Sequence, residues 1–275
     1  MRAGMAKDNS ASFALRYGPW AFVTGASRGL GAEFARQLAA RGLNLVLAAR
    51  SEDKLKELAD ALEREYNIAV KIIAIDLSRE DILDPVKKAT SSLEIGLLVN
   101  NAGLSTVGPF LNMSEDYLLK QFHTNARAAL ILTRHFGEKM AAQRRGGVIF
   151  LSSGSALHGS PFCANYSGTK AYNLMLAEAL WAEWKPLGVD ALGFIAGLTR
   201  TPGMEANGLK PSLFVPLGRP EKVVSRALNA LGKKPSAADG IRNRLGYNLF
   251  NLAPRSFSTG ILGKSMNAMF GPFYQ

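Results

Sequence analysis

Short apolar runs of strand length alternate with segments of helical periodicity through most of the chain. The strand-like runs occupy residues 20–23, 43–48, 70–75, 97–99, 148–151 and 189–195. The helical segments occupy residues 30–41, 51–66, 114–140 and 166–185, with Ser51 and Ser114 as expected N-caps. Strands that alternate with helices in this way form βαβ units with right-handed crossovers. The sequence therefore predicts an α/β fold: a single domain built on a doubly wound parallel sheet with helices on both faces.

The two ends of the chain differ from this alternating pattern. Residues 1–18 are polar and predict a flexible N-terminal arm, followed by a catalytic domain at residues 19–235. After residue 195 the chain becomes rich in Pro and Gly, so we expect no further strand, and the apolar segment at about 200–220 predicts a mobile lid. Residues 236–275 predict a helical extension packed on the domain or on a partner subunit. Its apolar residues at helical spacing are Phe257, Ile261, Leu262, Met266, Met269, Phe270 and Phe273.

Composition limits the class of protein. The 275 residues carry a net charge of +11, but no run of Lys or Arg is longer than Arg144-Arg145, so nucleic-acid binding is not expected. An excess of positive charge that is dispersed along the chain favours an anionic partner: a phosphorylated cofactor, an acidic carrier protein or an anionic membrane. Residues 240–275 contain Arg and Lys but no Asp or Glu, which keeps peripheral membrane contact open, although packing is favoured.

The cysteine and histidine content and the hydropathy of the chain exclude further classes of protein. Cys163 is the only cysteine, which excludes an internal disulfide, and the three histidines lack metal-ligand spacing, so no metal site is expected. The chain has neither an apolar run long enough to span a membrane nor an apolar signal-peptide core near its start. We therefore expect a cytoplasmic protein.

A glycine-rich turn follows the first predicted strand. Residues 24–31 read Thr-Gly-Ala-Ser-Arg-Gly-Leu-Gly; the glycines allow a pyrophosphate to approach closely, and the following helix offers free N–H groups. At the end of the second strand, where an acid would bind the ribose of NAD, stands Arg50. Together with Arg28 it suits a 2′-phosphate. The sequence predicts NADP(H), with contacts from Gly25, Ser27, Arg28, Gly29, Leu30, Gly31 and Arg50.

Three residues that lie further along the chain, Ser153, Tyr166 and Lys170, indicate proton transfer. Tyr166 and Lys170 are four residues apart, so they share one face of a helix, where the ammonium group can lower the pKa of the phenol. Ser153 follows the fifth predicted strand and can hold the same substrate oxygen. This arrangement is typical of acid–base chemistry on an alcohol or carbonyl.

Taken together, these motifs resemble those of the short-chain dehydrogenase/reductase family over about residues 18–230. In order, they are Thr24-Gly25-x-x-x-Gly29-x-Gly31, Asp76-Leu77, Asn100-Asn101-Ala102-Gly103, Asn125, Ser153 and Tyr166-x-x-x-Lys170. The resemblance implies a Rossmann-type fold and further contacts with the cofactor. Those contacts would come from Asp76 and Leu77 at the adenine, and from Asn100, Ala102, Gly103, Tyr166, Lys170, Gly197 and Thr201.

The same resemblance implies the catalytic roles. Tyr166 would be the acid/base, Lys170 would bind the nicotinamide ribose and lower the tyrosine pKa, and Ser153 would hydrogen-bond the substrate oxygen. Asn125 would help to hold a water for proton relay. One departure is Ala196, where family members often have proline before glycine, which allows the backbone a wider range of conformations there.

The expected activity is NADPH-dependent hydride transfer to or from the carbonyl or alcohol carbon of a small hydrophobic substrate. Residues expected to contact the substrate are Ser153, His158, Phe162 and Met204. Two alternatives stay open: reduction of a 3-oxoacyl group on a carrier protein or coenzyme A, and a non-catalytic NADP-binding sensor or scaffold. Relatives commonly pair through the helices near residues 114–142 and 165–185, so a homodimer or homotetramer is expected.

Overall fold

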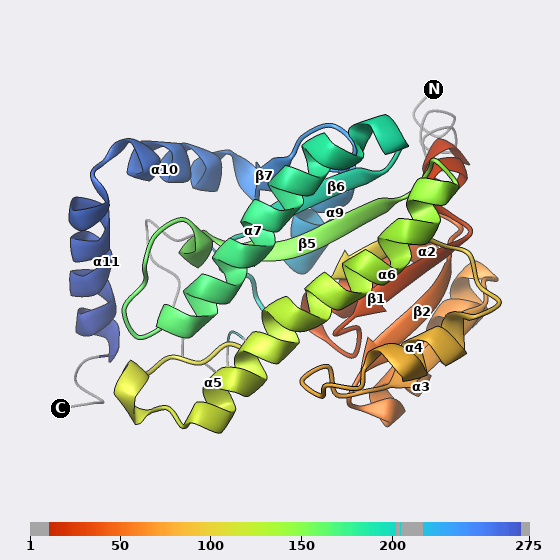
Figure 1. The fold of residues 1–275 in the computed structure, drawn as a ribbon, viewed down its shortest axis with the longest axis horizontal. Helices are drawn as coiled ribbons and strands as arrows, with labels where there is room; N and C mark the ends of the chain where they lie inside the picture. Colours follow the sequence, from red (N-terminus) through yellow and green to blue (C-terminus); the bar gives the residue numbers. More distant parts are fainter. Residues whose placement is uncertain (1–10, 202–203, 205–216, 271–275) are drawn as a thin grey trace.

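Seven parallel strands form one sheet at the centre of the molecule, in the order β3-β2-β1-β4-β5-β6-β7 (Figure 1). The computed structural model describes residues 11–201, 204 and 217–270. The strands are β1 (Trp20–Thr24), β2 (Asn44–Ala49), β3 (Val70–Ala74), β4 (Ile95–Asn100), β5 (Gly147–Ser153), β6 (Asp190–Ala196) and β7 (Ser236–Ala238). The strand order reverses at β1, with β2 on one side and β4 on the other, as in doubly wound sheets. The predicted fold class is confirmed.

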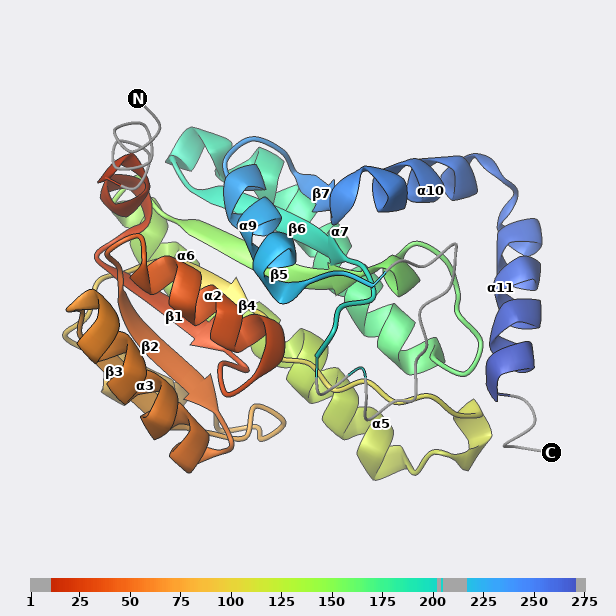
Figure 2. The ribbon, with the colours of Figure 1, turned by 180° about the vertical axis from the view of Figure 1, so that it is seen from behind.

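Helices cover both faces of the sheet because successive strand residues point to opposite sides. In β5, Val148 and Phe150 are buried against one helical layer, while Ile149 and Leu151 are buried against the other. Figure 1 shows the first layer in front, with α4 (Leu83–Thr90), α6 (Ala128–Ala142) and α7 (Ala164–Trp184). Figure 2 shows the second layer, with α2 (Gly29–Ala39), α3 (Glu52–Tyr66) and α9 (Pro220–Ala230).

The long helix expected at 114–140 contains a break. It consists of α5 (Glu115–Phe122), a π-helical turn (His123–Arg127) and α6. In the turn the N–H of Ala128 reaches back to the carbonyl of His123, five residues earlier. Ser114 caps α5 through a hydrogen bond from the N–H of Tyr117. Ser51 occupies the N-cap position of α3, but its side chain makes no capping hydrogen bond.

The seventh strand was not expected from the sequence. Residues 236–238 read Ser-Ala-Ala and pair in parallel with β6, so the sheet does not end near residue 195. Main-chain bonds hold this short strand: the N–H of Gly193 donates to the carbonyl of Pro235, and the N–H of Asp239 donates to that of Ile195. Small residues without β-branching carry no strand signal of their own. The extension therefore begins after the strand, near residue 239.

The N-terminal segment also differs from the flexible arm that was predicted. Residues 11–17 are helical, and Tyr17 is buried, with 4% of its surface exposed. Its hydroxyl donates to Asp190 at 2.7 Å, and Arg16 makes an ion pair with the same carboxylate at 2.6 Å. These contacts tie the segment to the start of β6. Residues 1–10 lie outside the described part of the chain.

The predicted C-terminal helical extension consists of α10 (Gly240–Leu252) and α11 (Arg255–Phe270). Both figures show α10 leading away from the end of β7 and α11 turning sharply beside the loop that precedes α7. Phe270 is buried and Leu262 and Met266 are half-buried, whereas Phe257 and Ile261 are exposed. The predicted apolar residues are thus divided between two faces of α11; the side chain of Met269 and residue Phe273 lie outside the description.

Within the described residues, no helix combines the length and the apolar character needed to cross a membrane.

Candidate active site

The carboxyl ends of β1 and β4 are joined through one hydroxyl group. Thr24, the last residue of β1, donates to the carbonyl of Val99 at 3.1 Å and accepts from the N–H groups of Asn101 and Ala102, both at 2.9 Å. The Asn101 side chain donates back to the carbonyl of Thr24 at 2.8 Å. The glycine-rich turn is therefore held directly against the turn after β4. Sequence reasoning did not assign this clamp to Thr24 and Asn101.

Glycine is required in this turn for steric reasons. Gly25 has φ of +66°, and a Cβ there would come within 2.9 Å of the Cα of Ala102. A Cβ on Gly31 would collide with the carbonyl oxygen of Gly25 and the side chain of Asn101. Gly29 has φ of +59°, and a Cβ there would lie 3.3 Å from the Cγ2 of Thr201. The bare backbone and the start of α2 fit a dinucleotide pyrophosphate, and Thr201 lies beside them as expected.

The ribose end of this cradle carries two exposed cations. Arg28 immediately precedes α2, and Arg50 immediately follows β2; both side chains are exposed. The ends of β1 and β2 are adjacent, since the N–H of Gly25 donates to the carbonyl of Ala48 at 2.7 Å. Two guanidinium groups at neighbouring strand ends fit a phosphorylated ribose.

The candidate adenine residues follow β3. Burial raises the pKa of the Asp76 carboxyl, but hydrogen bonds from the N–H and hydroxyl of Ser78 and the nearby charges of Lys120 and Arg50 outweigh it, so the pKa lies below its ordinary value. Asp76 is therefore an anion at neutral pH. The Leu77 side chain is buried in the core, which leaves only its backbone for an adenine contact.

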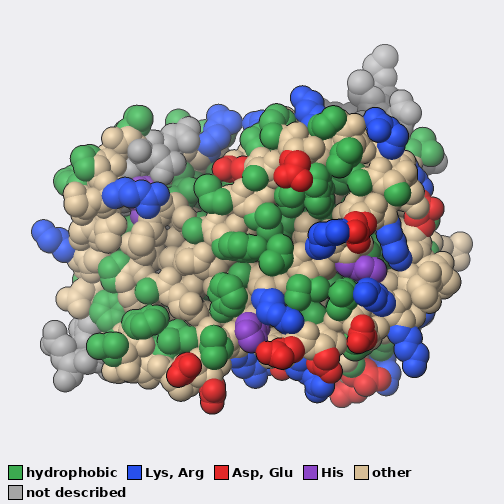
Figure 3. All heavy atoms as spheres, in the orientation of Figure 1, with side chains coloured by type: hydrophobic (Ala, Val, Ile, Leu, Met, Phe, Trp, Pro, Cys, Tyr) green, Lys and Arg blue, Asp and Glu red, His purple; other side chains and the backbone are tan. Residues whose placement is uncertain are grey.

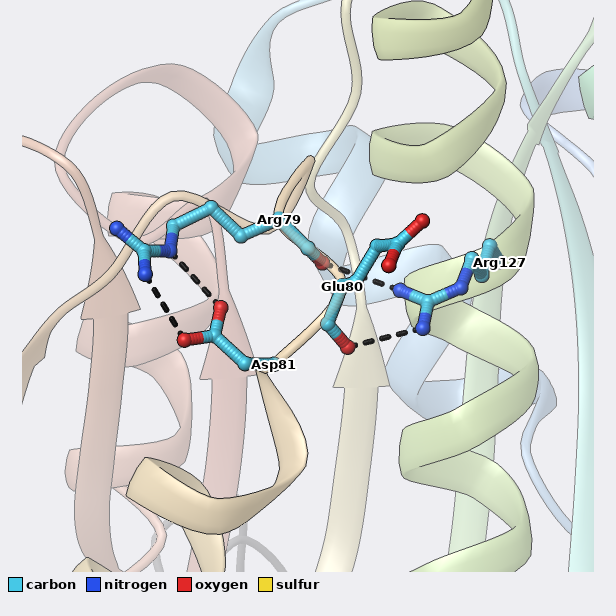
Figure 4. A network of polar contacts seen from close by, with 4 residues as sticks. All are labelled: Arg79, Glu80, Asp81 and Arg127. Atoms are coloured by element: carbon cyan, nitrogen blue, oxygen red, sulfur yellow. Dashed lines mark hydrogen bonds and ion pairs between the residues drawn. The ribbon is translucent and has the colours of Figure 1, made fainter.

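The loop after β3 is fixed to the π-helical turn that carries Asn125. Arg127 donates to the carbonyl of Arg79 at 3.0 Å and to that of Glu80 at 2.9 Å (Figure 4). Arg79 in turn makes a two-pronged ion pair with Asp81. One side of the candidate cofactor site is thereby linked to the helical turn that carries the candidate catalytic residue Asn125.

After the end of β4, the chain approaches two candidate catalytic residues, Lys170 and Asn125. A Cβ on Gly103 would lie 3.3 Å from the Nζ of Lys170 and 3.6 Å from the Oδ1 of Asn125. Asn100, in contrast, turns its side chain away into the core, where it is buried and donates to Thr133 at 2.9 Å. Its predicted contact with the cofactor can therefore involve only the backbone.

Asn125 is held from both sides. Its Oδ1 accepts from the N–H of Leu104 at 2.7 Å, and its Nδ2 donates to the carbonyl of Leu104 at 2.9 Å and to Thr169 at 3.1 Å. Asn173 on α7 donates to the carbonyl of Asn125 at 2.8 Å. Asn125 thus fixes the loop after β4 relative to α7, and its expected role in holding a relay water stays a prediction.

Lys170 and Tyr166 lie on α7, which packs along β5. The Nζ of Lys170 donates to the carbonyl of Leu151 at 2.8 Å and lies 5.8 Å from the centre of the Tyr166 ring. Only 5% of the lysine surface is exposed, and burial lowers its pKa to about 8. The hydroxyl of Ser152 donates to the Lys170 carbonyl at 2.8 Å, which fixes the helix against the strand.

The pKa of Tyr166 shifts in the direction opposite to the one expected from sequence. Burial raises it, and a hydrogen bond with Ser153 lowers it but does not compensate. The reason is geometric: the ammonium of Lys170 donates to a backbone carbonyl and lies over the ring. Ser153 ends β5, beside the same part of α7, so the hydroxyls of Ser153 and Tyr166 can reach one substrate oxygen.

The predicted substrate residues lie in the loop after β5 and beyond β6. His158 is buried, and Phe162 has φ of +63° while its carbonyl accepts from the N–H of Gly108 at 2.8 Å. Met204 is tied to Thr201, because its N–H donates to the threonine carbonyl at 3.0 Å. Of the predicted lid at about 200–220, residues 202–203 and 205–216 lie outside the described part of the chain.

Helix α10 supplies a wall that sequence reasoning missed. The hydroxyl and ring edge of Tyr247 lie against Gly154, where a Cβ would meet them at 2.5 to 3.1 Å, and Asn243 lies against Gly197. Gly154 and Gly197 follow the adjacent strands β5 and β6. Burial, together with the charge of Asp239, raises the pKa of Tyr247 to about 12, so its hydroxyl is neutral.

Cys163 just precedes α7. Burial raises the pKa of its thiol to about 11, which agrees with the packing role expected of it.

Comparison with known proteins supports one interpretation of this geometry. The family model for short chain dehydrogenases matches residues 19–211. The very-long-chain 3-oxoacyl-CoA reductase-A of Danio rerio is 34% identical over 221 residues, which cover 79% of this chain and 68% of the relative. A solved structure of a 7β-hydroxysteroid dehydrogenase is similar with a TM-score of 0.85 and 28% identity, covering 91% of this chain and 98% of the other. A short-chain dehydrogenase from Sphingobium yanoikuyae, solved in complex with NADPH, has a TM-score of 0.70 and 25% identity, with coverage of 83% and 91%.

Proposed function

Because the chain belongs to the short-chain dehydrogenase/reductase family, an oxidoreductase family acting on alcohols and carbonyls, we propose that it reduces a hydrophobic ketone with NADPH. The observation that carries the proposal is the meeting of Ser153, Tyr166, Lys170 and Asn125 beside the glycine cradle. A non-catalytic NADP sensor would not need these four groups together. Catalysis is therefore favoured over a binding role.

The chemistry follows from the protonation states of the side chains. NADPH, when bound, supplies a hydride to the carbonyl carbon. Tyr166 has a raised pKa and is protonated at neutral pH, so its hydroxyl can give a proton to the carbonyl oxygen. Ser153 can hydrogen-bond the same oxygen. Lys170, with a pKa of about 8, is mostly charged at pH 7, and its proposed role is to bind the nicotinamide ribose.

The preference for NADPH rests on Arg28 and Arg50 at the ribose end of the cradle. The chain carries arginine where an acidic residue would accept a hydrogen bond from an unphosphorylated ribose. Titration of the protein by its fluorescence should show tighter binding of NADPH than of NADH, and Arg50→Glu should reduce that difference by about tenfold or more. Equal affinities in the unaltered protein would contradict the preference.

The substrate is proposed to be apolar and bulky. The wall over Gly154 is an aromatic ring from α10, and α11 lies against the loop before α7, where Thr259 faces Gly159 and Gly263 faces Pro161. Two of the similar proteins are named for a 7β-hydroxysteroid and for a very-long-chain 3-oxoacyl-CoA. Reduction of a 3-oxoacyl thioester is the second candidate, favoured by the positive charge of the chain, which attracts an anionic carrier.

A screen of NADPH oxidation separates these candidates. Hydroxysteroid-type ketones, bulky aryl ketones and 3-oxoacyl-CoA thioesters of increasing chain length would each be offered, with Tyr166→Phe as the blank. Turnover of free ketones without turnover of thioesters supports the first candidate, and the reverse supports the second. If the protein binds NADPH but turns over none of these carbonyl compounds, the result would support the hypothesis of a non-catalytic sensor.

The front face of the helical layer is the proposed subunit interface. Hydrophobic side chains gather over α6 and α7 in Figure 3. The exposed large apolar residues of α5, α6 and α7 are Leu119, Phe122, Leu130, Tyr172 and Met175. An apolar face of this kind suits a second copy of the chain. Light scattering should give a dimer or tetramer that Met175→Asp weakens, and a monomeric unaltered protein would exclude this interface.

A further inference from the structure

Helix α10 has two faces of reversed polarity. Its inner face contacts the carboxyl end of the sheet through Asn243 and Tyr247, which lie against Gly197 and Gly154. Its outer face carries apolar side chains whose exposed fractions are 69%, 60%, 71% and 83%, at Ile241, Leu245, Leu249 and Leu252 respectively. A surface helix of a globular protein normally buries its apolar face and exposes its polar one. Here the helix presents leucine and isoleucine to the outside.

The spacing makes these four residues one stripe. At about 100° per residue, positions 241, 245, 249 and 252 fall within a quarter turn of one another, and positions 243 and 247 fall on the opposite side. Arg242 and Arg244 flank the stripe on its two sides, and both are exposed. An apolar stripe between cations is the pattern of helices that lie in a membrane interface.

Charge distinguishes between the possible occupants of this face. The extension also exposes Arg255 and Lys264, and residues 240–275 contain no Asp or Glu. Pairing of two copies through this face would bring like charges together, which is unfavourable. Anionic lipid headgroups would instead be attracted by the same side chains, each by about 1 kcal/mol. The apolar face over α6 and α7 is a separate surface that is left for a second copy.

We propose that the outer face of α10 docks on the surface of an anionic phospholipid membrane. The inner face of the same helix covers the residues that follow β5 and β6, so docking brings the catalytic end of the sheet close to the lipid. An apolar ketone dissolved in the bilayer then reaches the enzyme without crossing water. Only this last consequence rests on the proposed function; the docking itself does not.

Vesicle flotation of the full-length protein tests the docking. The protein should float with vesicles of phosphatidylcholine and phosphatidylglycerol but not with phosphatidylcholine alone, and salt should release it. Leu245→Asp and Leu249→Asp should each weaken binding by more than about tenfold. Leu15→Asp, at an exposed leucine of the N-terminal helix, is the matched control and should bind as the unaltered protein does.

Several outcomes would overturn the proposal. One is the absence of binding to anionic vesicles; another is equal binding to neutral and anionic vesicles. A third is loss of dimerisation in Leu245→Asp without any lipid binding by the unaltered protein, which would assign the face to a second copy. Each variant should keep NADPH binding, which reports its folding, and because flotation does not depend on turnover, its result is independent of the proposed function.

Discussion

Two parts of the sheet's carboxyl edge are closed in different ways. At β1 the turn after β4 closes the edge: Gly25 and Gly31 lie against each other, and both lie against the side chain of Asn101. At β5 and β6 the edge is closed by α10, whose Asn243 and Tyr247 come from the far end of the chain. The cofactor side thus depends on the absence of side chains, and the substrate side depends on which side chains a distant helix supplies.

The charged and titratable side chains of the two sides also differ in their exposure to water. Arg28 and Arg50 stand exposed at the proposed cofactor side, where water solvates both guanidinium groups. Lys170 is buried and Tyr166 is half-buried, and the loss of solvation moves both pKa values toward the neutral forms. The charges proposed to bind the cofactor are therefore solvated, and the groups proposed to react are largely shielded from water. The comparison predicts that mutations on the two sides change different measured quantities.

The largest difference between an effect on turnover and an effect on NADPH binding is expected from Tyr166→Phe. Removal of the proton donor should lower kcat by about a thousandfold, because general acid catalysis commonly contributes 10²–10⁴. The glycine cradle is untouched, so the dissociation constant of NADPH should hardly change. Steady-state NADPH oxidation and fluorescence titration measure the two effects. Tyr172→Phe, an exposed tyrosine of the same helix, is the control; a Tyr166→Phe enzyme with substantial turnover would refute the role of the phenol.

The cofactor side is tested by Gly31→Ala. The new methyl group collides with the carbonyl oxygen of Gly25 and the side chain of Asn101. We expect a loss of about 3 kcal/mol of folding stability, at the upper end for overpacking, together with much weaker NADPH binding. Chemical denaturation and titration measure both quantities.

A matched glycine in the C-terminal extension should give a change in folding stability of the opposite sign. Gly260 lies in α11, and a Cβ added there would point into open space, so Gly260→Ala should stabilise the protein by about 0.5–1 kcal/mol. If the two substitutions have equal effects, steric closure of the turn is not what the glycines provide.

How far the sequence could predict each side follows from this difference. The glycine turn, Arg50 and the spacing of Tyr166 and Lys170 are local patterns, so the sheet and the cofactor side could be predicted from them. The pKa direction of Tyr166 could not, because it depends on burial and on the carbonyl of Leu151 that engages the lysine.

Elements that depend on tertiary contacts were missed for a related reason. The strand at 236–238 has no β-branched residue and forms only because the edge of β6 is available. The π-helical turn at His123–Arg127 lies within a continuous run of helical residues and contains no Gly or Pro that would mark a break. The contact of Tyr247 with Gly154 joins parts of the chain that no local pattern relates.

A pH-dependent stability is expected from Lys170. Burial lowers its pKa from an ordinary 10.5 to about 8. Between these values the unfolded chain binds more protons than the folded one, so the free energy of unfolding gains from this residue as pH rises from about 8 to about 10.5. Lys170→Met removes the buried charge and should be more stable by about 2 kcal/mol at pH 7 while losing activity.

The advantage of Lys170→Met should shrink above about pH 8, as the lysine of the unaltered protein loses its proton. Denaturant unfolding of both proteins from about pH 7 to about pH 10 measures the difference, and the titration of all other groups cancels in it. If the difference in the free energy of unfolding between the two proteins is constant with pH, burial does not destabilise the protonated form of Lys170.

The smallest effect on the kinetics is expected from Tyr247→Ala, and it is the one that isolates the proposed substrate side. Removal of the ring leaves the backbone beside Ser153 without its wall, so the KM for a bulky ketone should rise by about tenfold. Tyr247→Phe keeps the ring and should stay close to the unaltered enzyme. Leu245→Ala, on the outer face of the same helix, should leave the KM of a dissolved ketone unchanged. A rise in the dissociation constant of NADPH in Tyr247→Ala would show that α10 belongs to the cofactor side as well, because a wall for substrate alone has no contact through which to weaken the dinucleotide.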